Sequence, residues 1–94
     1  MAGSAQPPLI PIRVTRSFRK NLAKKPAAMQ GAVIACVTQL RRDPRHPGLH
    51  THRVQGTRDV LEAYVDDANR VTFFWEDGCI VLENHCNHAI LNRP

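Results

Sequence analysis

The second half of the chain contains four short apolar segments with so few residues between them that only tight turns can connect them. The segments are rich in β-branched and aromatic residues and cover residues 49–55, 60–65, 71–75 and 80–84. Asp77-Gly78, between the last two, is the strongest hairpin signal in the sequence. Parallel neighbours need a crossover of about a dozen residues or more, so these strands must pair antiparallel. This half is therefore predicted to be an antiparallel meander.

The first half of the chain combines one strand-like segment with two amphipathic helices. Residues 10–14 alternate between apolar and polar or proline side chains, which favours an edge strand. Ser17 is placed to cap a short helix, and Pro26 ends that helix and opens the next. The second helix is predicted to end near Asp43-Pro44, and its apolar residues recur at helical spacing: Met29, Val33, Cys36, Val37 and Leu40.

The order of these elements predicts the fold class, which is α+β. It reads β-α-α-β-β-β-β with a short C-terminal helix at about residues 87–92, and it places two N-terminal helices on one face of a curled antiparallel sheet. The other face of the sheet is expected to stay open. A chain of 94 residues, of which 43% are hydrophobic, is long enough for one core and too short for two. We therefore expect a flexible tail at residues 1–8 and a single domain at residues 9–94.

Charge is unevenly distributed along the chain. Residues 1–58 hold eleven of the thirteen Lys and Arg residues but one acid, whereas residues 59–94 hold two basic residues and seven acids. A basic surface attracts a phosphate backbone or an acidic protein. No apolar run has the roughly 18 residues that a membrane-spanning helix needs, and no export signal is visible. We therefore expect a cytoplasmic protein with a polyanionic partner and no membrane contact.

Histidine and arginine side chains gather near the ends of the predicted strands. His50 and His52 are two residues apart on one strand and so share a face. Arg70 begins a later strand, where its guanidinium group can hold a phosphate with a bidentate fork. His85 and His88 lie where the last strand leaves the sheet. Because the ends of alternate strands in a meander meet at one edge, we expect these side chains to converge.

Such a set suits cleavage of RNA by its own 2′-hydroxyl group. One imidazole takes the hydroxyl proton, a second donor protonates the leaving 5′-oxygen, and the guanidinium stabilises charge on the phosphorane. The alternative for the same histidines is a zinc site that also uses Cys86. The spacing of Cys36, Cys79 and Cys86 suggests neither a disulfide framework nor a four-cysteine zinc site.

Three aromatic residues lie together on the predicted strand at residues 71–75. Phe73, Phe74 and Trp75 are all assigned to the core. Phe74 is the one aromatic residue of this strand that we consider as a stacking surface for a base.

Several local patterns occur in a recognisable order from Ile10 onward. They are Ser17-Phe18-Arg19-Lys20-Asn21-Leu22, Leu40-Arg41-Arg42-Asp43-Pro44, Arg53-Val54-Gln55-Gly56, Asn69-Arg70-Val71-Thr72-Phe73 and Asn87-His88. Together they resemble the RelE/ParE superfamily of bacterial toxins from type II toxin–antitoxin pairs. The resemblance covers nearly the whole chain.

The resemblance implies a microbial RNase-type fold and, in the RelE branch, cleavage of messenger RNA on the ribosome without a metal or another cofactor, which inhibits translation. Arg70 matches the phosphate-binding arginine of the family, and His88 matches a late histidine that some members use in proton transfer. The predicted catalytic residues are His50, His52, Arg70 and His88, and the predicted RNA-binding residues are Arg53, Arg58, His85 and Asn87. The implied partners are an acidic antitoxin, the ribosome and messenger RNA. We expect the antitoxin to lie across the helices and the sheet and to add a strand to a sheet edge.

The sequence also departs from the RelE pattern. The paired lysines of the middle strand are missing from residues 60–65, no tyrosine ends the chain, and Ala89 follows His88 where an acid is common. These differences keep two alternatives open. One is a ParE-like toxin that inhibits DNA gyrase, and the other is a small metal-binding domain.

Overall fold

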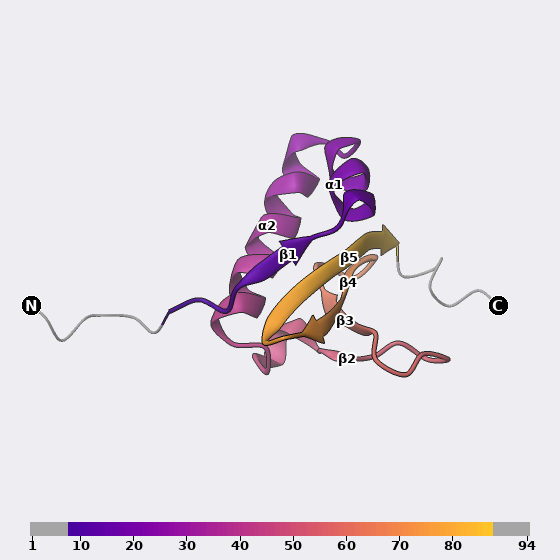
Figure 1. Ribbon diagram of the computed structural model, residues 1–94. Coiled ribbons are helices and arrows are strands. Elements are labelled where there is room, and N and C mark those ends of the chain that lie inside the picture. Colours follow the sequence, from indigo (N-terminus) through magenta and orange to yellow (C-terminus); the bar gives the residue numbers. More distant parts are fainter. Residues whose placement is uncertain (1–7, 88–94) are drawn as a thin grey trace, which may run out of the picture.

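The computed structural model describes residues 8–87, the last three of them by their backbone alone. Its helices are α1 (Arg16–Ala23), α2 (Ala27–Arg42) and the 3₁₀ turn η2 (Pro47–Leu49). Its strands are β1 (Ile12–Val14), β2 (His52–Arg53), β3 (Leu61–Tyr64), β4 (Asn69–Glu76) and β5 (Cys79–Asn87). Figure 1 shows α1 and α2 together on one side of the sheet. The predicted α+β class and the order β-α-α-β-β-β-β are confirmed.

Helix α1 begins earlier than its sequence predicts, because Thr15 and not Ser17 is the N-cap. The Oγ1 atom of Thr15 accepts a hydrogen bond from the amide of Phe18 at 3.2 Å and lies 2.8 Å from the carbonyl oxygen of Leu82 in β5. One hydroxyl thus joins the helix start to the sheet, whereas Ser17 is exposed to solvent. Helix α2 follows Pro26, as predicted.

The described strands form one sheet with the order β1-β5-β4-β3-β2. The pairs from β2 to β5 are antiparallel, as predicted for a meander. Strand β1 is an edge strand, also as predicted, but it runs parallel to β5 with Ile12 opposite Ile80. The expectation of a wholly antiparallel sheet is therefore wrong at this pair. The chain leaves β1 through two helices, and such a long connection permits a parallel return.

Two of the predicted turns take the expected form. Asp77 and Gly78 have positive φ angles of 52° and 76°, the backbone of a tight hairpin turn between β4 and β5. Before β4, the carboxylate of Asp66 accepts hydrogen bonds from the amides of Ala68 and Asn69, both at 2.9 Å. This side chain replaces the missing backbone partners of the turn.

The strand predicted at residues 49–55 is wrong over most of its length. Leu49 ends the 3₁₀ turn, His50 has a left-handed φ angle of 46°, and pairing is confined to His52 and Arg53. Pro47 at the start of η2 and the left-handed residue after it interrupt the extended backbone. The edge strand β2 is consequently much shorter than predicted.

The core lies between the helices and the facing side of the sheet. Its buried members are Phe18, Val33, Cys36, Val37, Leu40, Leu49, Ala63, Val71, Phe73, Ile80 and Leu82, with Met29 partly buried beside them. The predicted apolar stripe of α2 is thus confirmed. The prediction for Trp75 is wrong, because its side chain is 45% exposed. Strand β3 begins at Leu61, opposite Phe73, so Trp75 extends past the end of β3.

Two predictions involve the ends of the chain. Strand β5 includes Asn87, so the predicted C-terminal helix does not begin there. Residues 88–94, where the rest of that helix and His88 fall, and residues 1–7 of the predicted tail lie outside the described residues.

Candidate functional site

A row of polar side chains lies on the face of the sheet opposite the helices. Along β4, Val71 and Phe73 belong to the core, so Arg70 and Thr72 point to the other face. On β3, Glu62 is paired with Thr72 and Tyr64 with Arg70, which places these side chains on the same face. Arg70 is 8% exposed and Glu62 is 3% exposed. These two ionisable groups are therefore buried by their neighbours, although α1 and α2 lie on the other side of the sheet.

Glu62 links the predicted histidine and arginine residues. Its Oε1 atom lies 2.7 Å from Nε2 of His52 on the neighbouring strand β2 and 3.9 Å from Nε of Arg70 on β4. The strand register explains this geometry, since His52 is opposite Glu62 and β3 lies between β2 and β4. A buried carboxylate needs a partner of opposite charge or a hydrogen-bond donor, and these two residues supply both.

The ring of His52 has acceptors at both of its nitrogens. Nδ1 lies 2.7 Å from the backbone carbonyl of His50, and a carbonyl oxygen only accepts, so Nδ1 carries a proton. Nε2 faces the Glu62 carboxylate, and the two side chains form an ion pair whenever the ring is protonated. This His52–Glu62 pair lies next to the Arg70 guanidinium.

The Arg70 guanidinium also closes the turn before its own strand. Its Nη1 atom donates to the carbonyl oxygens of Asp66 at 2.6 Å and Asn69 at 3.1 Å. Within the described residues, Nη2 makes no hydrogen bond.

The same turn also contains Asp66, whose pKa is lowered. The main cause is the hydrogen bond from the Asn69 side chain, with smaller contributions from backbone amides and Arg70. The turn is thus held by charge-assisted hydrogen bonds.

Tyr64 and His50 complete the cluster. The Arg70 Cζ atom lies 4.2 Å from the centre of the Tyr64 ring, and the Tyr64 and His50 ring centres are 5.1 Å apart. The Tyr64 hydroxyl donates a hydrogen bond to Asp67, which raises the pKa of Tyr64 above its usual range. Within the described residues the His50 ring makes no hydrogen bond, and the residue is exposed. Among the described residues, both ring nitrogens of His50 are thus available to an incoming molecule, whereas His52, whose side chain is also exposed, has a partner at each ring nitrogen.

The remaining predicted site residues do not gather at one end of the sheet. Arg53 lies on β2 and Arg58 in the loop that follows it, and both are exposed. His85 and Asn87 are placed by their backbone on β5, opposite Val71 and Asn69. His88 lies outside the described residues. The roles that the sequence suggests for all of these residues stay predictions.

Sequence reasoning missed Glu62 and Tyr64. Both lie on a strand where the RelE-type lysines were sought and not found. The available signal was an acid and a tyrosine two residues apart within an otherwise apolar segment, which places them on one face of a strand. An ionisable residue in such a segment needs a buried partner, and Arg70 and His52 were the candidates at hand.

The described residues form neither a cluster of metal ligands nor a helix that could span a membrane. Among the described residues, no three histidine, cysteine, aspartate or glutamate side chains are grouped so that they would hold a metal ion. No helix within residues 8–87 is both long enough and apolar enough to cross a membrane.

The structure combines two helices on one face of a mixed sheet with a His-Glu-Arg-Tyr cluster on the other. Its fold also occurs in proteins of known structure. No protein-family model matches the chain, and no curated protein matches it either. Solved structures do match. The toxin–antitoxin complex RelBE2 from Mycobacterium tuberculosis aligns with a TM-score of 0.71 at 19% identity, over 86% of this chain and 93% of that one.

Two further structures extend the comparison. YafQ from E. coli aligns with a TM-score of 0.69 at 17% identity, over 87% of this chain and 97% of that one. The archaeal RelE–RelB complex from Pyrococcus horikoshii aligns with a TM-score of 0.66 at 20% identity, over 92% of this chain and 99% of that one. The chain therefore has the fold of RelE-superfamily toxins, and the resemblance seen in its sequence is confirmed at the level of the fold.

Proposed function

We propose that this protein is the toxin of a toxin–antitoxin pair and that it cleaves messenger RNA on the ribosome without a metal ion. The observation that carries the proposal is the cluster in which Glu62 links His52 to Arg70. Through Tyr64 the same cluster reaches the exposed His50 ring, so it combines an imidazole with a guanidinium group, and these supply the proton transfer and the charge stabilisation that cleavage by a 2′-hydroxyl needs. The likeness of the fold to the toxin–antitoxin complexes supports the first part of the proposal, a toxin that pairs with an antitoxin.

Each side chain of the cluster has a distinct task in this proposal. The exposed His50 ring takes the proton from the attacking 2′-hydroxyl. Arg70 stabilises the negative charge of the phosphorane, and its Nη2 atom is the nitrogen left for a phosphate oxygen. The His52–Glu62 pair holds Arg70 in place, and the sequence-predicted donor to the leaving 5′-oxygen is His88. The exposed Arg53 and Arg58 contact the RNA backbone.

The decisive assay adds purified protein to a translating extract and maps breaks in the message. We expect ribosome-dependent cuts, and we expect His50→Asn to slow them by roughly a hundredfold or more. Asparagine is chosen because it tolerates the left-handed backbone of His50. Arg70→Lys keeps the charge, loses the fork and should also impair cleavage. Arg42→Lys, at the exposed end of α2, is its matched control and should cut normally.

Other results of this assay would refute the proposal. Intact message together with blocked DNA supercoiling would assign the chain to gyrase inhibition. Normal cleavage by a folded His50→Asn protein would remove His50 from the chemistry.

An apolar groove on the helical side supports an antitoxin as the partner. A hollow of about 340 Å³ lies between α1, α2 and β1, and its lining residues include Ile12, Val14, Phe18, Leu22, Val33, Ile34, Arg19 and Arg41. Ile34 is 57% exposed within this apolar wall. Arg19 and Arg41 would attract an acidic chain, and the adjacent edge strand β1 offers a place for strand addition. We propose that an acidic antitoxin segment lies in this groove.

The groove is tested in cells that express the toxin together with the acidic protein that neutralises it. Ile34→Asp should keep its toxicity and escape neutralisation, because it places a buried like charge in the contact. Ala35→Asp, at the next exposed position of α2, is the matched control and should still be neutralised. Equal neutralisation of both variants would place the antitoxin elsewhere.

A further inference from the structure

Trp75 is a large aromatic side chain in an unusual position. The alternation along β4 places it on the same face as the buried Val71 and Phe73, yet it is 45% exposed. Strand β3 begins opposite Phe73, so β4 continues past it and Trp75 has no β3 neighbour. It is also the single tryptophan of the chain. An exposed indole at the end of a sheet presents a large aromatic surface to an incoming molecule.

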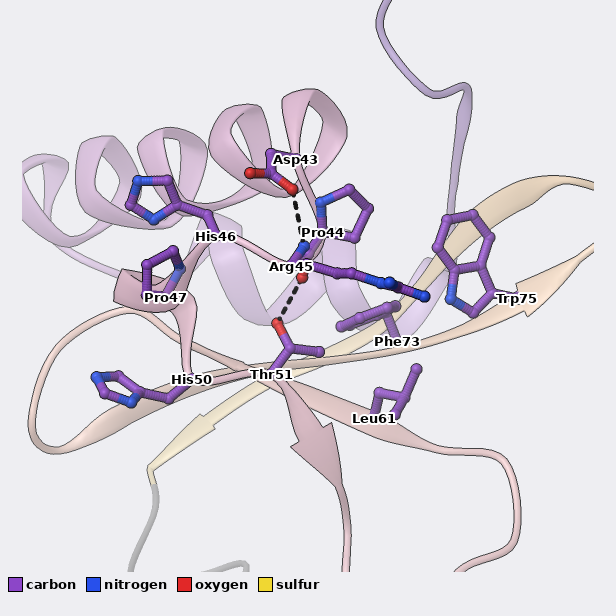
Figure 2. A pocket seen from close by; sticks show the side chains of 10 residues that line it. All are labelled: Asp43, Pro44, Arg45, His46, Pro47, His50, Thr51, Leu61, Phe73 and Trp75. Carbon is purple, nitrogen blue, oxygen red and sulfur yellow. Dashed lines mark hydrogen bonds between the residues drawn. The ribbon is translucent and has the colours of Figure 1, made fainter.

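A hollow of about 700 Å³ lies beside Trp75. Figure 2 shows Phe73 and Leu61 at its base, Trp75 on one side, and the Arg45 side chain extending toward Trp75 above Phe73. The hollow is therefore apolar below, aromatic on one wall and cationic at its rim. Its volume lies within the range of known ligand sites.

The loop that forms the other wall is held by its own hydrogen bonds. The Asp43 carboxylate accepts from the amide of Arg45 at 3.1 Å, and the Thr51 hydroxyl donates to the carbonyl of Pro44 at 3.1 Å, as Figure 2 shows. The Arg45 backbone is thus fixed while its side chain stays exposed. The site is formed before any ligand arrives.

We propose that this hollow binds one unpaired base of single-stranded RNA, stacked on the Trp75 indole, with Arg45 paired to a phosphate of the same strand. Stacking on an aromatic ring together with a nearby guanidinium is the chemistry by which proteins hold single strands. The inference rests on the proposed function, because the base belongs to the RNA that is cleaved.

His50 connects this subsite with the catalytic cluster. It lines the hollow, and its ring also packs against Tyr64 at 5.1 Å. An RNA strand whose scissile phosphate lies at His50 therefore passes around the β2 edge, from the face that carries Arg70 to the face that carries Trp75. An acidic peptide would satisfy Arg45 equally well, but it would leave the flat indole face without a planar partner.

The single tryptophan supplies the assay. The full chain is titrated with a short single-stranded RNA whose 2′-hydroxyl groups are methylated, so that it binds but is not cut. We expect saturable quenching of the Trp75 fluorescence, and we expect inorganic polyphosphate, which has charge but no bases, to leave it unchanged. Quenching by polyphosphate, or by an acidic Glu-Leu peptide in place of the RNA, would overturn the inference.

Variants test the same point by the anisotropy of a labelled copy of that RNA. Trp75→Leu should bind roughly ten- to one-hundredfold more weakly, and Trp75→Phe should recover part of the loss. Arg45→Ala should weaken binding and make it less sensitive to salt. Lys24→Ala is the control, because it also removes one positive charge but lies at the end of α1, just before the start of α2 and far along the helix from Arg45. It should bind RNA normally.

The subsite and the proposed function fail separately. RNA that binds and is cleaved without any change in Trp75 fluorescence overturns the subsite and leaves the cleavage function standing. Quenching by RNA in a protein that never cuts message overturns the function and keeps the subsite. Equal affinities of Trp75→Leu and the parent chain overturn the subsite as well.

Discussion

Replacing Glu62 with glutamine tests whether burial or distance decides the strength of an ion pair in this protein. Glu62 is 3% exposed, and its carboxylate lies 2.7 Å from His52 Nε2 and 3.9 Å from Arg70 Nε. Arg13 and Glu76 lie 3.0 Å apart, closer than Glu62 and Arg70, but their side chains are 53% and 54% exposed. Water screens the exposed pair, so distance alone would rank the Glu62–Arg70 and Arg13–Glu76 pairs wrongly.

The structure sets the expected magnitudes. Removing one partner of a buried pair typically costs about 3–5 kcal/mol, because the other charge stays buried without compensation. Glutamine keeps the shape and one acceptor, so we expect Glu62→Gln to lower the free energy of unfolding by about 3 kcal/mol. Glu76→Gln should lower it by less than about 1 kcal/mol. A domain of this size has roughly 5–15 kcal/mol of stability, so both variants should fold.

Urea unfolding followed by circular dichroism measures these values. A double-mutant cycle of Glu62→Gln with Arg70→Met should give a coupling energy of about 1 kcal/mol or more, and the cycle of Glu76→Gln with Arg13→Met should give about half a kcal/mol or less. Equal losses for Glu62→Gln and Glu76→Gln would refute the reasoning, because burial would then not determine the strength of the pair.

Three further predictions concern the core, a cap and a helix. Burial raises the pKa of Cys36 from 9.0 to about 11, so its contribution to stability is complete below pH 9 and is lost toward pH 11. The loss should reach roughly 3 kcal/mol, it should vanish in Cys36→Ala, and it should persist in Cys79→Ala. Thr15→Ala should lower the free energy of unfolding by about 1–2 kcal/mol and Ser17→Ala by less than about 0.5; the opposite order would make Ser17 the cap. Gly31→Ala should raise the melting temperature, since nothing lies within 4 Å of the added methyl group and alanine favours the helix by about 1 kcal/mol.

Much of the fold follows from local chemistry that a sequence displays. The helical spacing of Val33, Cys36, Val37 and Leu40 predicted the buried stripe of α2, and Asp77-Gly78 predicted the hairpin that joins β4 and β5. These predictions succeeded because periodicity and turn chemistry act over a few residues.

Predictions failed where a distant part of the chain decides the outcome. Thr15 became the cap because it also reaches Leu82, 67 residues away in sequence. Trp75 follows the alternation of a core residue but is exposed, because β3 begins too late to flank it. Alternation specifies the face of a strand to which a side chain points, and only the neighbouring elements determine whether anything covers it.

The residue types of the candidate site were visible in the sequence, but their arrangement was not. His50, His52 and Arg70 could be selected from their chemistry, whereas Glu62 gained significance only when the register of β2, β3 and β4 placed it between His52 and Arg70. The sequence by itself thus determined the helices, the hairpins and the α+β class, because each depends on nearby residues. The tertiary structure decided the parallel pairing of β1 and the contacts of Glu62, because a pairing register between distant segments depends on the packing of the whole chain.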